Sequence, residues 1–352
     1  MLRKFVSFCL AALALLAMTA CGPTGQPETV SWRLQTHSYR GSVDFAALQT
    51  FAENVARMSE GRFTISIHEG GELANGPDIF RAVSDGRIEM GNGWPNWWSG
   101  QHPAWAVMNA GPFDFMNLDA SMMFFFEGKG TELANELSLP LGVIWRPAWW
   151  SGMEFGLLSK TPIYGLDDLE GKRMRFGPGL PSEVMAEASG AYTIPLVPQE
   201  ILPALRDGSI EMVEWANPSG VLDLGIHEEC RYALIPAIWQ PSVLSDFLIN
   251  EEAYGRLSPD LQQILESAMR DFSLKATLES KLSDFAAIES MKEMGMELNV
   301  WSDSDIQRWR RANDTIVERY RREDEFSKRL IDAKQAFKAR YDSYYEFYQA
   351  YE

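Results

Sequence analysis

Hydrophobic and polar positions in this chain of 352 residues follow two different periods. Segments 32–34 and 63–67 alternate apolar and polar residues, as half-buried strands do, whereas the apolar residues of 48–58 recur at helical spacing. A strand, helix, strand unit of this kind forms a parallel pair with a right-handed crossover, and ligands of open α/β sheets lie beyond the carboxyl ends of the strands. We therefore expect loops 37–42 and 69–77 to lie near a binding site.

A twelve-residue pattern occurs twice. IFRAVSDGRIEM, residues 79–90, returns 122 residues later as ILPALRDGSIEM, residues 201–212, with seven of twelve positions identical. Each copy predicts a helix that ends at Asp-Gly, followed at once by a short buried strand. The strand ends then carry polar and aromatic residues, GNGWPNWW from residue 91 and EWANP from residue 214. The duplication predicts two related α/β lobes that face each other and place such side chains at equivalent strand ends.

The remaining patterns set the domain boundaries that we expect. The second lobe should span residues 153–240, with strands at 174–176 and 192–196 and a helix at 181–189, and the first lobe should comprise 31–152 plus 241–301. A Ser-Pro-Asp helix start at 258–260 opens a segment without glycine or proline up to Gly295. That segment should pack back on the first lobe.

Residues 302–352 contain neither glycine nor proline and begin with the cap sequence Ser302-Asp303-Ser304. A straight helix of about 48 residues would be about 70 Å long, more than one lobe can cover. It would have to bend across both lobes, project into a partner subunit and form a homodimer through residues 303–352, or both. Two antiparallel helices joined near residues 321–324 are the alternative.

The N-terminus predicts export. Residues 1–4 are basic, 5–18 are apolar, and small residues precede Cys21, which is typical of a signal peptide over 1–20, a lipidated Cys21 and a lipoprotein tether over 21–30. A plain signal peptide with an incidental Cys21 is the alternative. Cys9 would leave with the signal and only Cys230 would remain besides Cys21, so no intrachain disulfide is expected. These features predict a periplasmic or other extracytoplasmic location with a membrane anchor at Cys21.

Charge and motifs narrow the classes of function. Removal of the signal takes Arg3 and Lys4 and changes the net charge from −17 to −19, which makes nucleic acid an unfavourable partner. The chain lacks the common hydrolase, zinc, redox and phosphate-loop motifs, and its four histidines lack metal-ligand spacing. An exported glycosidase that uses Glu154 and Glu214 is a remaining alternative, although acids are numerous enough for such a pair to arise by chance.

Arg175 and the end of the second repeated strand are candidate ligand contacts. Arg175 precedes the turn Gly177-Pro178-Gly179, where a guanidinium beside helix-end amides could hold a carboxylate with two hydrogen bonds. Glu214 could bind a hard cation or a ligand hydroxyl, and Trp215 could offer a flat apolar wall. The alternatives are a surface arginine paired with an acid, a core Trp215 and a locally paired Glu214.

Aromatic residues gather near the expected lobe junctions. Asn96 and Trp97 lie at the end of the first repeated strand, and Trp150 and Trp239 lie elsewhere at these junctions. The tryptophans also allow a carbohydrate or amino-acid binder of another transporter type, although several of them should be core residues.

Taken in order and spacing, many short segments resemble the DctP-type solute-binding proteins of TRAP transporters over nearly the whole mature chain. The segments are Met58-Ser59-Glu60-Gly61-Arg62, Gly71-Glu72-Leu73, residues 82–86 into Met90-Gly91, Trp98 with Pro103-Ala104, Pro112-Phe113, Gly171-Lys172 with Met174-Arg175, Glu183-Val184-Met185, and residues 203–205 through Glu214-Trp215. The resemblance implies a two-lobed α/β clamp of the type II periplasmic-binding-protein class with a long C-terminal helix. It also implies an extracytoplasmic protein, not an enzyme, that delivers an organic acid to sodium-driven TRAP permease subunits.

The resemblance also assigns roles to residues. Arg175 would pair with the ligand carboxylate and Phe176 would help to line the pocket. Glu214 and the Trp215 carbonyl would occupy the cation-binding positions of the subgroup that takes 2-oxo or 2-hydroxy acids, so that Na⁺ or Ca²⁺ could bridge the ligand and Glu214. No other cofactor is required, and the C-terminal helix is similar to that subgroup's dimer-forming helix.

Two departures from the family pattern bear on the ligand. Relatives have a glutamine that touches metal and ligand where this chain aligns Trp150, which puts the metal in question. Relatives have an aromatic pair where this chain has Asn96-Trp97, which predicts a pocket for a bulkier or aromatic monocarboxylate. Trp239 completes the set of expected ligand-binding residues.

Overall fold

A computed structural model describes residues 29–109 and 111–349. The predicted signal peptide, Cys21 and the tether up to residue 28 lie outside these described residues. Residue 30 already belongs to the first strand. Within the described ranges, no helix is both long and apolar enough to cross a membrane.

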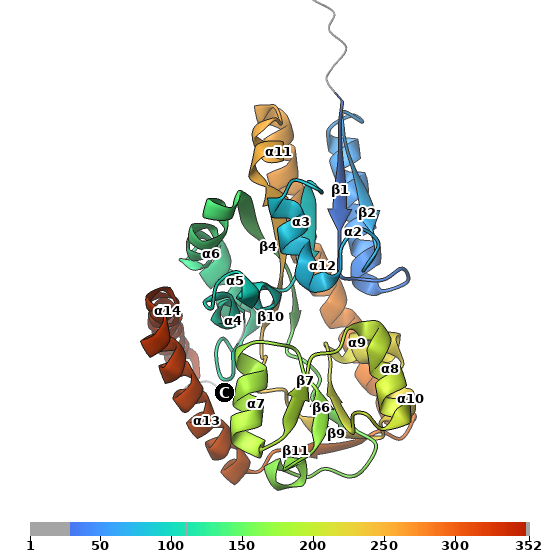
Figure 1. The fold of residues 1–352 in the computed structure, drawn as a ribbon, viewed down its shortest axis with the longest axis vertical. Helices are drawn as coiled ribbons and strands as arrows, with labels where there is room; N and C mark the ends of the chain where they lie inside the picture. The colour runs from blue at the N-terminus through green and yellow to red at the C-terminus, as the bar shows by residue number, and fades with distance from the viewer. Residues whose placement is uncertain (1–28, 110, 350–352) are drawn as a thin grey trace, which may run out of the picture.

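The first lobe is built on a five-stranded sheet, the upper one in Figure 1, in the order β2-β1-β3-β10-β4. Strands β1 and β2 pair in parallel and are joined by helix α2, which confirms the predicted strand, helix, strand unit. Ser42 caps α2 by accepting a hydrogen bond from the Phe45 amide. The strands are β1 (Val30–Gln35), β2 (Phe63–His68), β3 (Met90–Gly93), β4 (Val143–Gly152) and β10 (Val243–Asn250), and α2 is Val43–Met58.

Helices cover both faces of this sheet. Helix α2 and the long helix α12 pack together over one face, and shorter helices cover the other. The shorter elements are η1 (Gly76–Asp78), α3 (Ile79–Ser84), η2 (Pro95–Gly100), α4 (Trp105–Met108), α5 (Leu118–Phe126), α6 (Gly130–Ser138) and η3 (Leu139–Leu141). Helix α11 (Glu251–Gly255) packs through Ala253 in the same cluster as α2 and α12.

The second lobe contains a six-stranded sheet in the order β11-β9-β5-β8-β6-β7. Its central strand β8 pairs in parallel with β6 and antiparallel with β5. The elements are β5 (Leu157–Ser159), η4 (Leu166–Leu169), β6 (Arg173–Arg175), α7 (Leu180–Ser189), β7 (Tyr192–Ile194), α8 (Pro198–Asp207), β8 (Met212–Glu214), α9 (Pro218–Leu224), α10 (Ile226–Glu229), β9 (Tyr232–Ile235) and β11 (Glu297–Val300).

The repeated sequence forms the same unit in both lobes. Helix α3 runs into β3, and helix α8 runs into β8. Gly86 and Gly208 follow these helices with φ of 69° and 78°, the left-handed conformation that an L side chain rarely adopts. Strands β3 and β8 each have a parallel partner on one side and an antiparallel partner on the other, so the two repeats occupy equivalent places.

Helix α12 (Pro259–Glu293) connects the lobes, because it contacts α2 and β4 in the first and α9 in the second. After it, β11 pairs in parallel with β9 and so extends the second sheet. The sequence placed all of 241–301 in the first lobe. The structure corrects this assignment, because α12 is long enough to carry the chain to the opposite lobe before β11 begins.

The C-terminal segment consists of two helices, α13 (Asp303–Glu323) and α14 (Glu325–Gln349), which meet at Asp324. Asp324 has an extended backbone, and its carboxylate accepts a hydrogen bond from the Ser327 amide at the start of α14. Arg321 contacts Asp332 and Gln335, so the second helix folds back on the first. Helix α13 packs on α7 of the second lobe, and α14 packs on α4 and α5 of the first. Of the alternatives that the sequence left open, the structure has two helices.

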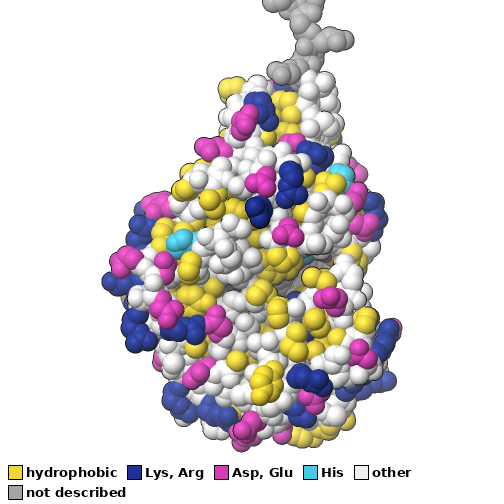
Figure 2. Space-filling view, viewed as in Figure 1, with side chains coloured by type: hydrophobic (Ala, Val, Ile, Leu, Met, Phe, Trp, Pro, Cys, Tyr) yellow, Lys and Arg dark blue, Asp and Glu magenta, His cyan; other side chains and the backbone are white. Residues whose placement is uncertain are grey.

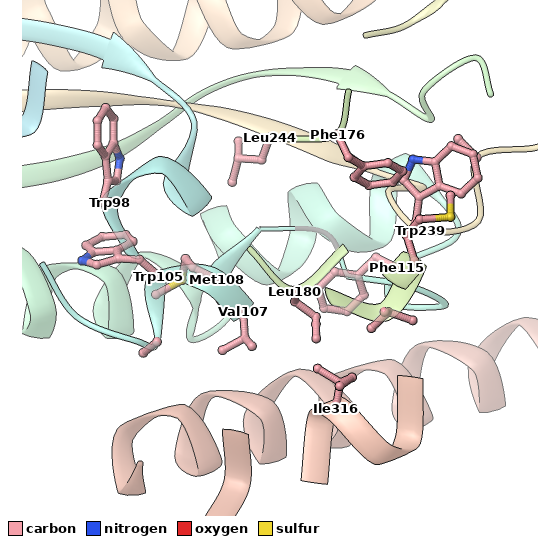
Figure 3. Packing of buried hydrophobic residues seen from close by; sticks show 14 of the residues in the cluster. Trp98, Trp105, Val107, Met108, Phe115, Phe176, Leu180, Trp239, Leu244 and Ile316 are labelled. Carbon is pink, nitrogen blue, oxygen red and sulfur yellow. The ribbon is translucent and has the colours of Figure 1, made fainter. Parts of the chain in front are cut away.

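The cores of the two lobes are continuous at this junction. Figure 3 shows Phe176 beside Trp239, with Leu180 of α7 and Ile316 of α13 in the same cluster as Trp98 and Trp105 of the first lobe. Trp239 stacks on Trp309 with ring centroids 5.6 Å apart. Large aromatic side chains therefore fix the C-terminal helices against both lobes.

Candidate functional site

A cavity of about 120 Å³ lies between the lobes and is lined from both. Figure 2 shows the surface hollowed between the upper and lower lobes, with apolar side chains on both sides of the hollow. The predicted loop 37–42 supplies His37, Ser38, Tyr39 and Ser42, whereas loop 69–77 contributes no lining residue. Of the two loops expected near a binding site, only the first lines this cavity.

Arg175 and Glu214 form the polar floor of this cavity. Both side chains are buried, and Arg175 Nη1 donates to Glu214 Oε2 at 2.7 Å and to the Glu214 carbonyl at 2.9 Å. Arg175 Nε donates to the Leu196 carbonyl at 3.2 Å, and the guanidinium lies 4.8 Å from the Trp215 ring centre. Nη2 has no hydrogen-bond partner among the residues that the structure describes. A ligand carboxylate can therefore take this free donor without disturbing the ion pair.

The glycine turn that precedes α7 contributes a backbone amide to this site. Gly177 N donates to Glu214 Oε2 at 2.9 Å, and Gly179, with φ of 104°, immediately precedes α7. Asn96 Cβ lies 3.2 Å from the point that a side chain at Gly179 would occupy. Glycine therefore lets the turn approach the first lobe closely.

Glu154 is a second buried carboxyl at the same place. Trp239 Nε1 donates to Glu154 Oε2 at 2.9 Å, and Glu214 lies within hydrogen-bonding reach. Burial, with the negative charge of Glu214, raises the pKa of Glu154 well above its ordinary value. Glu214 is thus paired with Arg175, and Glu154 lies next to this ion pair in a setting that favours its protonated form.

The first lobe contributes an aromatic wall. Trp97 and Asn96 of η2 line the cavity as predicted, and Asn96 Nδ2 donates across the cleft to the Pro178 carbonyl at 2.7 Å. The Trp97 ring lies against Gly76, where a β-carbon would come within 2.5 Å of it. Trp215 lines the opposite side. The predicted strand ends from both lobes therefore meet at one cavity.

The structure corrects the position of Trp150. Its side chain is fully buried in the first lobe, donates to Ser121 Oγ at 2.9 Å and does not line the cavity. Neighbouring residues of a strand point to opposite faces, so Trp149 and Ser151 line the cavity instead. Trp150 is therefore not among the residues that line this cavity.

Phe176 and Trp239 are also displaced from their predicted roles. Phe176 follows Arg175 on the strand and so points to the other face, where it packs on Trp239 with ring centroids 5.5 Å apart. Neither ring lines the cavity, but Trp239 donates a hydrogen bond to Glu154, which does line it. Both residues are core residues that pack next to the residues lining the cavity.

Several lining residues were missed from the sequence. They are Trp149 and Ser151 of β4, Gln240 and Val243 at the start of β10, Asp44 of α2, Asn217, Ser219 and Asp223 in and beside α9, and Glu279 and Ser280 of α12. Glu154 was considered only as half of a catalytic pair. Asp44 follows the predicted loop 37–42 closely in the sequence, but no sequence pattern marks the other positions.

The donor set fits a hard cation. Glu154 and Glu214 line the cavity and carry carboxyl oxygens, the kind of ligand that Na⁺ and Ca²⁺ accept, and Trp215 lines it next to Glu214. Over residues 29–109 and 111–349, no group of three or more His, Cys, Asp or Glu side chains could hold a metal ion by itself. A cation here would need oxygen atoms from a bound ligand to complete its shell.

Comparison with known proteins agrees with this geometry. Residues 36–324 match the bacterial extracellular solute-binding protein family 7, DctP. The chain is 28% identical over 343 residues to the monocarboxylate 2-oxoacid-binding periplasmic protein of Nostoc sp. (strain PCC 7120), covering 96% of this chain and 93% of that protein.

Two solved structures are similar at 25% identity each, with a TM-score of 0.86. The TRAP periplasmic solute-binding protein of Pseudoalteromonas atlantica, with bound sodium and pyruvate, covers 92% of this chain and 98% of its own. The corresponding protein of Colwellia psychrerythraea, with bound calcium and pyruvate, covers 92% and 99%.

The family match extends over most of the chain, and the two lobes enclose a buried arginine in a shared cleft. The chain therefore belongs to the bacterial extracellular solute-binding proteins of family 7, the DctP family.

Proposed function

We propose that this protein captures an organic monocarboxylate between its lobes and delivers it to the sodium-coupled permease of a TRAP transporter. The observation that carries the proposal is the buried Arg175 with a free Nη2 beside an interlobe cavity. The 2-oxoacid-binding relative and the two pyruvate-bound neighbours support this ligand class. The ligand is a 2-oxo or 2-hydroxy acid or a bulkier monocarboxylate, and the aromatic wall favours a bulkier side chain than that of pyruvate.

A cation is part of the proposed complex. The sodium and calcium of the pyruvate-bound neighbours support an ion that joins the ligand oxygens to Glu214, Glu154 and the Trp215 carbonyl. These residues of the chain would hold the ion, and the ion would supply the positive charge that the paired carboxyls lack. No further cofactor is needed.

Calorimetric titration tests the carboxylate site. A thermal-shift screen of 2-oxo and 2-hydroxy acids, starting with pyruvate and phenylpyruvate in the presence of Na⁺ or Ca²⁺, first identifies a ligand. Arg175→Ala should then lower the affinity for that acid about 100-fold or more, because charge-assisted hydrogen bonds are lost. Arg175→Lys keeps the charge but loses the forked donor geometry, and should lower the affinity less.

Arg173→Ala is the matched control, because Arg173 lies two residues away on the same strand with an exposed side chain. It should bind with unchanged affinity. Circular dichroism confirms that each variant is folded. Wild-type affinity in a folded Arg175→Ala variant would contradict the proposal.

The arrangement of the two carboxyls disfavours an exported glycosidase. Glycosidases keep the paired carboxyls about 5 Å or more apart to leave room for the scissile bond, whereas Glu154 lies within hydrogen-bonding reach of Glu214. We therefore infer a binding protein without catalytic activity. Neutral sugars should give no thermal stabilisation, and a stabilising sugar would favour the carbohydrate-binder alternative.

Two further predictions concern the surroundings of the protein. The lipid anchor at Cys21 predicts a membrane-associated, extracytoplasmic protein, which mass spectrometry of the mature N-terminus would test.

The homodimer through 303–352 stays a prediction, and the side chain of Phe347 near the end of α14, 76% exposed, is consistent with a partner there. A monomeric mass in light scattering at micromolar concentration would contradict it.

A further inference from the structure

The cavity carries far more negative than positive charge. Among the described residues that line it, Arg175 is the one lysine or arginine, whereas five are acids. Glu214 pairs with Arg175, Glu154 accepts a hydrogen bond from Trp239, and Glu279 contacts Lys275 at 3.8 Å. The other two acids, Asp44 and Asp223, form a second carboxylate group, which the proposed carboxylate site does not use.

Asp44 and Asp223 come from opposite lobes. Asp44 lies in the first turn of α2 and accepts a hydrogen bond from Ser38 Oγ. Asp223 lies near the end of α9 and lines the cavity together with Val43 and Asp44 at the start of α2. Burial, together with the Asp44 carboxylate, raises the pKa of Asp223. The two acids are therefore close enough to repel each other when the lobes are together.

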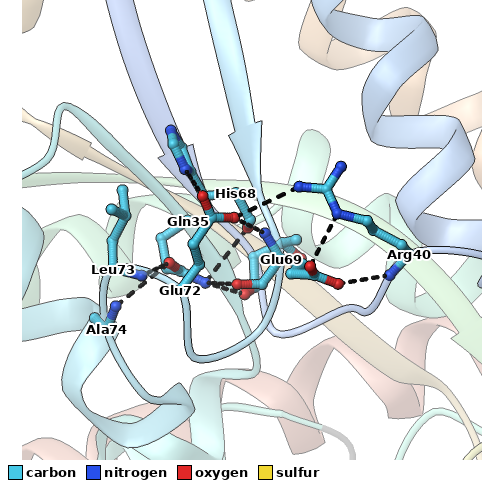
Figure 4. Close-up of polar contacts among 8 residues, drawn as sticks. Gln35, Arg40, His68, Glu69, Glu72, Leu73 and Ala74 are labelled. Atoms are coloured by element: carbon cyan, nitrogen blue, oxygen red, sulfur yellow. Dashed lines mark hydrogen bonds and ion pairs between the residues drawn. The ribbon is translucent and has the colours of Figure 1, made fainter.

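No cationic side chain compensates this pair. Within residues 29–109 and 111–349, no lysine, arginine or histidine forms a salt bridge with Asp44 or Asp223. Arg40 is the nearest arginine along the chain to Asp44, but Figure 4 shows it engaged by Glu69, which accepts from Arg40 Nε at 2.9 Å, with Glu72 beside it. Burial lowers the pKa of His37 despite the nearby Asp44, so the imidazole stays neutral near pH 7.

Aromatic rings lie beside these acids. The His37 ring centre is 4.9 Å from that of Trp94 and 5.7 Å from that of Trp97, and Trp94 is 6.1 Å from Trp149. All four residues line the cavity, and His37 Nε2 is a buried nitrogen without a hydrogen-bond partner in the described part of the chain. Indole faces next to carboxylates attract alkylammonium groups, because the ring quadrupole and the negative charge act together on a weakly hydrated cation.

We propose that the ligand is a zwitterion whose carboxylate binds Arg175 and whose distal ammonium group lies between Asp44 and Asp223 against the indole rings. This inference rests on the proposed function, because it adds a second subsite to the same cavity. A quaternary or alkylated ammonium suits the subsite best, since its methyl groups contact the rings while its charge balances the two acids. The acids also lie on different lobes, so such a cation would favour the closed arrangement.

Pairs of ligands that have the same shape but differ in the charge of the distal group test the proposed ammonium subsite. The pairs are trimethylammonioacetate with 3,3-dimethylbutanoate and 4-(trimethylammonio)butanoate with 5,5-dimethylhexanoate, in which carbon replaces nitrogen. Calorimetry on the wild-type protein should show that one zwitterion binds at least about tenfold more tightly than its carbon analogue. Equal or tighter binding of both carbon analogues would overturn the inference, as would the absence of binding by either zwitterion.

Variants locate the effect. Asp44→Asn and Asp223→Asn should each reduce the preference for the zwitterion about tenfold, while affinity for the carbon analogue stays the same or rises. Asp207→Asn changes the net charge equally at an exposed position outside the cavity and should leave the preference unchanged. An unaltered preference in both folded cavity variants would place the cation elsewhere and overturn the inference.

Arg175→Ala separates this inference from the proposed function. It should weaken both members of a pair by a similar factor, because both carry the carboxylate. If monocarboxylates such as phenylpyruvate bind and depend on Arg175 but the zwitterion preference is absent, the carboxylate site stands and the second subsite fails. If Arg175→Ala changes no affinity, the proposed function itself fails.

Discussion

Asp246 is a carboxyl held inside the first lobe by two indole groups. Its side chain is fully buried, and Trp98 Nε1 and Trp145 Nε1 each donate to Oδ2 at 2.7 Å. Burial outweighs these hydrogen bonds and raises the pKa of Asp246 to about 7. The residue therefore couples folding to proton uptake without any contact with the proposed ligand site.

The sign of this coupling gives a prediction for stability. Between the ordinary carboxyl value and about pH 7, the unfolded chain has released this proton while the folded chain keeps it, so the contribution to stability falls as pH rises and levels off above pH 7. The Asp246→Asn variant has no carboxyl group at this position that can take up or release a proton. Relative to wild type, its free energy of unfolding should therefore rise by about 2 kcal/mol between pH 5.5 and pH 8.

Urea unfolding at the two pH values measures this difference. Asp260→Asn is the control, because hydrogen bonds from Ser258 and Arg62 lower the pKa of Asp260 to about 2, outside the window. The control should keep a constant difference from wild type between pH 5.5 and pH 8. Equal pH dependence of wild type and Asp246→Asn would contradict the prediction.

Helix α14 is attached to the first lobe by a buried cation. Lys334 Nζ donates to the carbonyls of Val107 and Asn109 at 3.0 and 2.9 Å and forms an ion pair with Asp114. Further along the helix, Tyr341 donates to Asp119. Lys334 thereby donates to two backbone carbonyls at the end of α4.

Replacement of Lys334 by methionine should therefore be costly. Loss of one member of a buried ion pair removes the Lys334 cation from Asp114 and the Lys334 hydrogen bonds to two carbonyls, so the free energy of unfolding should fall by about 3 to 5 kcal/mol. Lys328→Met, on an exposed position of the same helix, should change it by no more than about 0.5 kcal/mol. Equal stability of the two variants in chemical unfolding would show that α14 docks without the Lys334 contacts.

At the scale of the whole molecule, two long connections join the lobes. Helix α12 runs from α2 and β4 to α9, where Asn217 and Ser219 donate to Asp284 Oδ1 at 2.7 and 3.0 Å. Helices α13 and α14 join the opposite side, one on each lobe. The cavity lies between these connections, so a ligand inside it contacts both lobes at once.

Hydrogen exchange with and without ligand tests this arrangement. The acid that gives the largest thermal shift should slow amide exchange in segments 37–44 and 94–98 of the first lobe and 175–179 and 214–223 of the second, because it holds the two sides together. Helix α11, remote from the cavity, should exchange at an unchanged rate. Protection confined to one lobe would contradict binding between the lobes.

The sequence alone determined the features that depend on neighbouring residues. The periods of 32–67 specified the first parallel pair, and the twelve-residue repeat specified two equivalent helix and strand units, because each glycine ends its helix by local geometry. Ser302 was recognised as a helix cap, and its hydroxyl accepts from the Asp305 amide. The position of Arg175 after a strand and before a glycine turn was also visible locally, and it led to the cavity.

Tertiary structure decided what depends on distant partners. Trp145 and Trp150 lie in one core cluster and Trp149 lies in the other, because irregularities in the pairing of β4 with β10 break the simple alternation between them. No local pattern brings Glu154 to Glu214, Asp44 to Asp223, or β11 to the second sheet. Each of these contacts forms because long helices and buried strands bring separate parts of the chain together, and burial then sets the charge that the cavity requires of its ligand.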